Sequence, residues 1–140
     1  MYTFLLHAHS GLRYLILLAA VIVVTKSFIG WFKDTSYSKF DKIIALAYVG
    51  LMHLQLLLGF ILYLISPFVT FNMSDKVSRY WSVEHILLMT LAVAATQAGR
   101  SLSKKSNDDQ VKFRFQAIFF SISIILILVA LATMPGRSII

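Results

Sequence analysis

Six ionisable side chains lie within long apolar stretches of this sequence, where they could hold a metal ion or a cofactor. They are His7, His9, Arg13, His53, Glu84 and His85. A charge inside a bilayer is costly, so ionisable residues in membrane helices usually mark a functional site. Imidazole is a ligand of haem iron, copper and zinc. The histidines are therefore the first candidates for ligands.

The stretches that carry these residues are long enough to cross a membrane. Of the 140 residues, 59% are hydrophobic and 14% are charged, whereas a soluble domain averages roughly 25% charged residues. A membrane-spanning helix needs ~20 apolar residues. We expect an all-α integral membrane protein, in which residues 1–140 form one up-down-up-down four-helix bundle. The expected spans are residues 3–24, 43–65, 81–98 and 115–134.

The basic residues predict the orientation of the bundle. Nine of the thirteen Lys and Arg residues lie in the predicted loops 25–42 and 99–114. The positive-inside rule places these loops in the cytoplasm and both termini outside, which fits a bacterial inner membrane protein. The loops are too short for a catalytic domain or a nucleic-acid-binding domain. The absence of cysteine excludes disulfides, thiolate metal sites, iron–sulfur clusters and covalent haem attachment.

Glycine, proline and aromatic residues predict where the spans end. Gly99 and Gly136 should close the third and fourth spans, and Pro67 and Pro135 should follow the second and fourth. Aromatic residues near span ends are typical of a belt at the membrane surface. The candidates for this belt are Trp31, Tyr63, Phe68, Tyr80 and Trp81.

The depths of the ionisable residues predict a polar layer near the outer surface. At ~1.5 Å per residue, His9 and His85 lie at similar depths in the first and third spans, which are diagonal in a simple bundle. They should face each other across the core, as the axial ligands of a six-coordinate haem do. Arg13 lies four residues after His9 on the same helix face, where it could hold a haem propionate or pair with Glu84. His53 lies deeper, in the second span, and could replace one of the two ligands.

Other residues of the spans have supporting roles in this interpretation. Met89 lies one turn after His85 and could pack against the haem. Gln55 and Gln97 are expected to form hydrogen bonds between helices. His7 is so close to the N-terminus that we expect an interfacial residue without a role in the site.

Two alternatives remain open from the residues alone. His9, His85 and His53 could bind one copper or zinc ion, although the depth of His53 argues against this. Alternatively, no cofactor is bound, and the polar layer fixes helix packing in a structural or assembly subunit or in a homo-oligomer.

Three motifs resemble those of a group of small bacterial four-helix membrane proteins that are often labelled cytochrome b. The motifs are His-Ser-Gly-Leu-Arg at 9–13, His-x-Gln at 53–55 and Glu-His at 84–85, and the resemblance covers almost the whole chain. It implies a b-type haem held by histidines and electron transfer in the membrane.

We therefore expect haem b, held by two of the three histidines at 9, 53 and 85. Arg13 would bind a propionate, and Glu84 would orient a neighbour or compensate its charge. We expect an electron carrier or an accessory subunit of the respiratory chain rather than a stand-alone enzyme. Its expected partners are the lipid bilayer, a membrane protein or a second copy of the chain, and a quinone.

Overall fold

The computed structural model describes residues 1–135, and the span end predicted at Gly136 lies outside this range. The described part of the chain is helical and contains no β-strand. Four of its helical stretches are long and apolar enough to cross a membrane, as predicted. The elements are α1 (Tyr2–Lys33), α2 (Lys39–Ile65), α3 (Lys76–Arg79), the π-helical turn η1 (Tyr80–Glu84), α4 (His85–Lys105) and α5 (Asp109–Thr133). The third of the four stretches runs without interruption from α3 through η1 into α4.

The helices continue well beyond the predicted spans, so the expected loops 25–42 and 99–114 are too long. The connection between α1 and α2 consists only of residues 34–38, and that between α4 and α5 of residues 106–108. Helix formation does not stop where the apolar stretch stops, because local caps decide the ends. The Asp34 N–H bonds to the Gly30 carbonyl from a left-handed conformation, and Ser38 and Asp41 form a capping box that starts α2.

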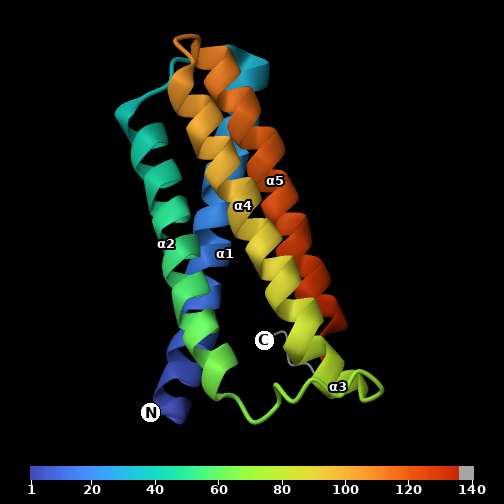
Figure 1. Cartoon of the computed structure of the whole chain (residues 1–140). Helices are drawn as coiled ribbons and strands as arrows, with labels where there is room; N and C mark the ends of the chain where they lie inside the picture. The colour runs from blue at the N-terminus through green and yellow to red at the C-terminus, as the bar shows by residue number, and fades with distance from the viewer. Residues whose placement is uncertain (136–140) are drawn as a thin grey trace.

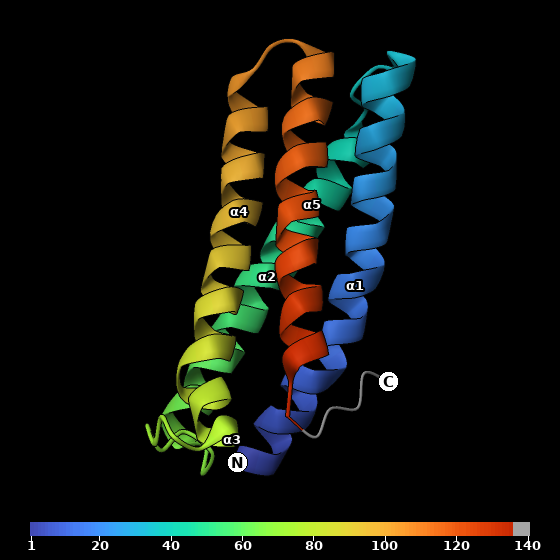
Figure 2. The ribbon, with the colours of Figure 1, turned by 90° about the vertical axis from the view of Figure 1, so that its right-hand side faces the viewer.

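The four long helices form a bundle in which α1 and α4 are diagonal. Helix α1 packs against α2 and α5, and α4 packs against the same two helices. The two short connections lie at one end of the bundle (Figures 1 and 2), which we call the loop end (residues 27–41 and 99–116). The start of α1, the end of α2, the start of α4 and the end of α5 lie at the opposite end. Figure 1 shows the α1–α2 pair diverging from the α4–α5 pair toward that opposite end.

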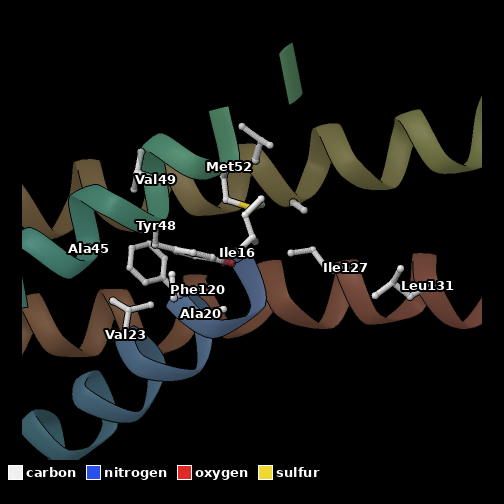
Figure 3. Close-up of a cluster of buried hydrophobic side chains, with 13 residues drawn as sticks. Ile16, Ala20, Val23, Ala45, Tyr48, Val49, Met52, Phe120, Ile127 and Leu131 are labelled. Atoms are coloured by element: carbon white, nitrogen blue, oxygen red, sulfur yellow. The ribbon is translucent and has the colours of Figure 1, made fainter. Parts of the chain in front are cut away.

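The centre of the bundle is a compact apolar core to which all four long helices contribute (Figure 3). Tyr48 and Phe120 are fully buried there and pack edge to face. The Tyr48 hydroxyl lies 2.6 Å from Ser123 Oγ, which in turn donates a hydrogen bond to the Phe120 carbonyl. The one phenol of this core is therefore satisfied inside the protein.

Large apolar side chains also cover the outside of the helices. Leu18, Leu64 and Ile125 are each more than half exposed, at 59%, 67% and 59%. A helix that is apolar on all sides belongs in a membrane or in the core of a large protein. The outer surface of this bundle therefore fits contact with a lipid bilayer.

A closed polar cluster at the loop end has Gln116 at its centre. Its Oε1 accepts a hydrogen bond from Ser27 Oγ (3.2 Å), and its Nε2 donates to Ser103 Oγ (3.2 Å) and to the Tyr37 hydroxyl. Burial raises the pKa of Tyr37 above its ordinary value, so the phenol stays a neutral hydrogen-bond partner. Both polar atoms of the buried Gln116 amide thus have partners within the protein.

Two glycines allow close helix packing at the loop end. A Cβ at Gly30 of α1 would lie 2.5 Å from three atoms of the Phe113 ring, and one at Gly99 would lie 2.9 Å from Phe119 Cβ. Gly99 was expected to close the third span, but α4 continues for six residues beyond it, to Lys105. Its role is packing against α5, because only a residue without a side chain fits there.

Candidate functional site

A cavity of about 500 Å³ lies where the two helix pairs diverge, at the end opposite the loop end. We call this the cavity end (residues 2–16, 52–69, 80–93 and 127–135). The volume is in the range of ligand pockets, roughly 300–1,000 Å³. Within the described residues the lining is mostly apolar and includes no Asp or Glu. The histidine, arginine and glutamine residues that line it are His7, His9, Arg13, Gln55 and His85.

The side chains of His9 and His85 meet in this cavity from diagonal helices. Their ring centroids are 6.4 Å apart and their planes form an angle of 75°. Two imidazoles that each bind one shared metal ion through a nitrogen at ~2 Å have centroids roughly 6 Å apart. The spacing therefore suits a single ion, or the iron of a flat cofactor, between the rings. The two rings share a layer, as the depth argument requires, whereas their binding of a cofactor stays a prediction.

Two residues of α2 position His9. Gln55 Nε2 donates a hydrogen bond to the His9 backbone oxygen (2.7 Å). Gly59 leaves room for the ring, since a Cβ there would lie 3.0 Å from His9 Cε1. Yet His9 Nδ1 and Gln55 Oε1 are buried without a hydrogen-bond partner among the described residues. Such atoms are costly to bury unless water or another group in the cavity binds them.

The π-helical turn η1 comes immediately before His85. The backbone N–H of His85 bonds to the Tyr80 carbonyl, five residues earlier. Single π turns inside α-helices occur frequently at functional sites. Here the turn brings the Tyr80 hydroxyl to 3.2 Å from His85 Nδ1, and the same hydroxyl lies 2.6 Å from the Ala130 carbonyl oxygen of α5. The second imidazole of the pair is therefore held by a phenol.

The Arg13 guanidinium lines the cavity without an acidic partner. Its Nη2 donates a hydrogen bond to the adjacent Tyr14 hydroxyl (3.2 Å), and its Nε is buried with no partner in the described part of the chain. The alternative of an Arg13–Glu84 ion pair is wrong, because Glu84 Oε2 binds Arg79 Nε at 2.9 Å and the carboxylate is 41% exposed. Glu84 is not among the residues that line the cavity.

His53 does not reach the cavity. Its side chain is exposed, and its Nε2 lies 2.9 Å from Gln97 Oε1 of α4, which gives Gln97 its expected interhelical hydrogen bond. Within residues 1–135, no three or more His, Cys, Asp or Glu residues are grouped so that they could hold a metal ion. The structure thus brings together two of the three candidate histidines, and it does not assemble the three-histidine copper or zinc site.

Tyr80 is the site residue that the sequence did not reveal. It was expected in an aromatic belt at the membrane surface, but it is 1% exposed and lies between His85 and α5. In a regular α-helix, residues five apart point about 140° away from each other, so the spacing gave no signal. His7, expected to lie outside the site, lines the cavity with an exposed side chain, and Met89 lines it as well.

Comparisons with known proteins give no relative from which a function could be transferred. No protein-family model, curated protein or solved structure matches the chain. The resemblance to proteins labelled cytochrome b therefore remains a prediction, and the chemistry of the site is argued from its geometry.

Proposed function

We propose that this chain is a small b-type haem protein of the bacterial inner membrane that carries single electrons. His9 and His85 would hold the haem in the cavity. The bundle would run up-down-up-down across the membrane, with both termini outside and the basic regions 25–42 and 99–114 in the cytoplasm.

The observation that carries this proposal is the His9–His85 pair across the cavity, with centroids 6.4 Å apart. A haem macrocycle supplies the equatorial ligands of its iron, so two histidines from the protein complete the coordination. A bare zinc ion is held by three or four protein ligands, and the described residues group no third ligand with the pair. The geometry therefore favours haem over a mononuclear metal ion.

The charge of the cavity supports the same ligand. Arg13 is its permanent cation, and no carboxylate from the described residues lines it. A b-type haem brings propionate groups, and a charge-assisted hydrogen bond from Arg13 Nε to a propionate would satisfy a buried atom that has no partner within the described chain. The haem propionate would thus supply the acceptor and the negative charge that Arg13 lacks among the described residues.

Haem b held by two histidines would supply a one-electron redox couple, which suits electron transfer more than oxygen chemistry. The protein's own residues hold it, bind its propionate and surround it with an apolar wall. That wall limits access of water, and access of water affects a redox potential. A quinone dissolved in the membrane, or a membrane-protein partner on the outer helix faces, would exchange the electron. The protein would then serve as a carrier or as an accessory subunit of a respiratory complex.

The test is a reduced-minus-oxidised visible spectrum of the gently purified full-length protein, expressed with haem precursor. We expect the sharp α-band of a six-coordinate b haem, with near one haem per chain by pyridine haemochrome assay. A flat spectrum under these conditions would refute the proposal. A full band in His9→Ala would instead refute His9 as a ligand.

A further inference from the structure

We propose that Tyr80 is a positioning residue that fixes one tautomer of His85, with the proton on Nδ1 and the lone pair of Nε2 free for the cavity. The tautomer follows from contacts within the chain. The use of that lone pair as a haem ligand rests on the proposed function.

The argument starts from the single proton of the Tyr80 hydroxyl. Its oxygen lies 2.6 Å from the Ala130 carbonyl oxygen, and a carbonyl can only accept a hydrogen bond. The phenol proton is therefore directed to Ala130. Toward His85 Nδ1, at 3.2 Å, the same hydroxyl can then only accept, so Nδ1 must carry a hydrogen.

The Ala130 carbonyl is a fixed acceptor because of its place in α5. That helix ends at Thr133, and the last four carbonyls of a helix have no partner within the backbone ladder. Ala130 is 1% exposed, so bulk water does not satisfy its carbonyl. Its other contact is a longer hydrogen bond from Thr133 Oγ1 (3.4 Å). The end of α5 thus provides a buried acceptor that holds the phenol in one orientation.

The π turn is what allows Tyr80 to reach His85. In a π-helix the N–H of one residue bonds to the carbonyl five residues earlier, as His85 and Tyr80 do. Five residues then make slightly more than one turn, and the two side chains lie on the same side, with ring centroids 5.5 Å apart. A continuous α-helix would point them about 140° apart. The π turn therefore brings the Tyr80 phenol next to the His85 imidazole.

The tautomer also decides which ring nitrogen faces the cavity, because a neutral imidazole has one nitrogen with a hydrogen and one with a lone pair. The rings of His9 and Trp81 lie next to the His85 ring, with centroids 6.4 Å and 5.1 Å away. With Nδ1 protonated, Nε2 of the neutral ring carries the lone pair, and no described residue forms a hydrogen bond with it. Histidines that bind a metal usually donate their other N–H to an acceptor of the protein, which is the role assigned to the Tyr80 oxygen.

The tautomer is measured by ¹⁵N NMR of the full-length protein in detergent, labelled at histidine and prepared without haem, with His85→Gln used to assign the signals. We expect His85 to show a protonated Nδ1 and an unprotonated Nε2. In Tyr80→Phe this preference should be lost. The matched control is Tyr63→Phe, which removes another phenol bound at the turn, through its hydrogen bond to the Ser82 carbonyl (2.7 Å), and should leave His85 unchanged.

A protonated Nε2 in the unsubstituted protein would overturn the inference, and so would an equal change in both Phe variants. The unsubstituted protein decides the first point even if Tyr80→Phe fails to fold. In haem-loaded protein, Tyr80→Phe should raise the midpoint potential relative to Tyr63→Phe, because a less basic imidazole stabilises oxidised iron less. An unchanged potential would overturn the positioning role. If no haem is bound but the predicted tautomer is found, the proposed function fails while the assignment of Tyr80 holds.

Discussion

The two ends of the bundle treat buried polar side chains in opposite ways. At the loop end, both polar atoms of the buried Gln116 amide have partners within the chain, and Asp41 Oδ1, which accepts no hydrogen bond from the described residues, forms an ion pair with Lys26 Nζ at 3.4 Å. At the cavity end, His9 Nδ1, Arg13 Nε and Gln55 Oε1 are buried without one among the described residues. A satisfied network stabilises one packing, whereas unsatisfied groups beside a cavity are free to bind a ligand or water. The difference separates polar residues that hold the fold from those that serve a site.

Glycine is used differently at the two ends as well. At the loop end, the space above Gly30 is filled by the apolar ring of Phe113, while at the cavity end the space beside Gly59 is filled by the imidazole of His9. The first contact is part of the packing. The second places a functional side chain close to the backbone of a neighbouring helix.

The largest expected effect is on cofactor binding at the cavity end. His85→Ala should abolish the b-haem spectrum, because an axial ligand is lost, while the apparent melting temperature of the haem-free protein stays close to that of the parent. His53→Ala is the matched control and should keep the full spectrum, since His53 lies outside the cavity. Visible spectroscopy and thermal denaturation in detergent measure both. Retention of a six-coordinate spectrum in His85→Ala would contradict the assignment.

The next largest effect is on packing at the loop end. Gly30→Ala should lower the free energy of unfolding by about 1–3 kcal/mol, because its Cβ would clash with the Phe113 ring. Gly11→Ala is the control, since nothing lies within 4 Å of a Cβ there. The control should be neutral or stabilising by up to ~1 kcal/mol, the helix propensity difference. Equal stability of the two variants would show that the close contact is not needed.

Loss of the polar cluster should cost somewhat less. Gln116→Leu keeps the volume but leaves Ser27, Ser103 and Tyr37 without their shared partner, which should cost about 1–2 kcal/mol of unfolding free energy. Haem content should not change, because the cluster is at the far end from the cavity. Reversible unfolding in mixed micelles gives the first quantity and the haemochrome assay the second. A stable variant with reduced haem would reverse the roles that we assign to the two ends.

The smallest expected effect on stability is at Arg13. Arg13→Met removes a guanidinium with an unsatisfied buried nitrogen, so the haem-free protein should change by no more than ~0.5 kcal/mol or become more stable. Haem should nevertheless dissociate faster in this variant, as measured by transfer to apomyoglobin. A loss of stability as large as that of Gln116→Leu would mean that Arg13 is a structural residue and that the two ends do not differ.

The coarse fold could be predicted from the sequence, whereas the details of the site could not. Hydropathy identified four helices that are long and apolar enough to cross a membrane, and the rise per residue placed His9 and His85 in one layer. Helix ends were missed because caps such as Ser38 end or start a helix beyond the apolar stretch. The position of Tyr80 was missed because a π turn leaves the hydrophobic pattern unchanged while it rotates the residues before it. The position of Glu84 was missed because its partner, Arg79, lies before the predicted span.

The π turn also links the position of the segment that precedes it to the surroundings of His85, the candidate ligand. Residues 66–75 are hydrogen-bonded to the start of the third helical stretch, where Ser78 Oγ accepts a hydrogen bond from the Asn72 N–H (3.0 Å) and pairs with Thr70 Oγ1 (2.6 Å). A π turn has the effect of one inserted residue, so its conversion to a regular α-helical turn would rotate everything before it by about 100° around the helix axis. Such a rotation would separate the Tyr80 phenol from the His85 ring.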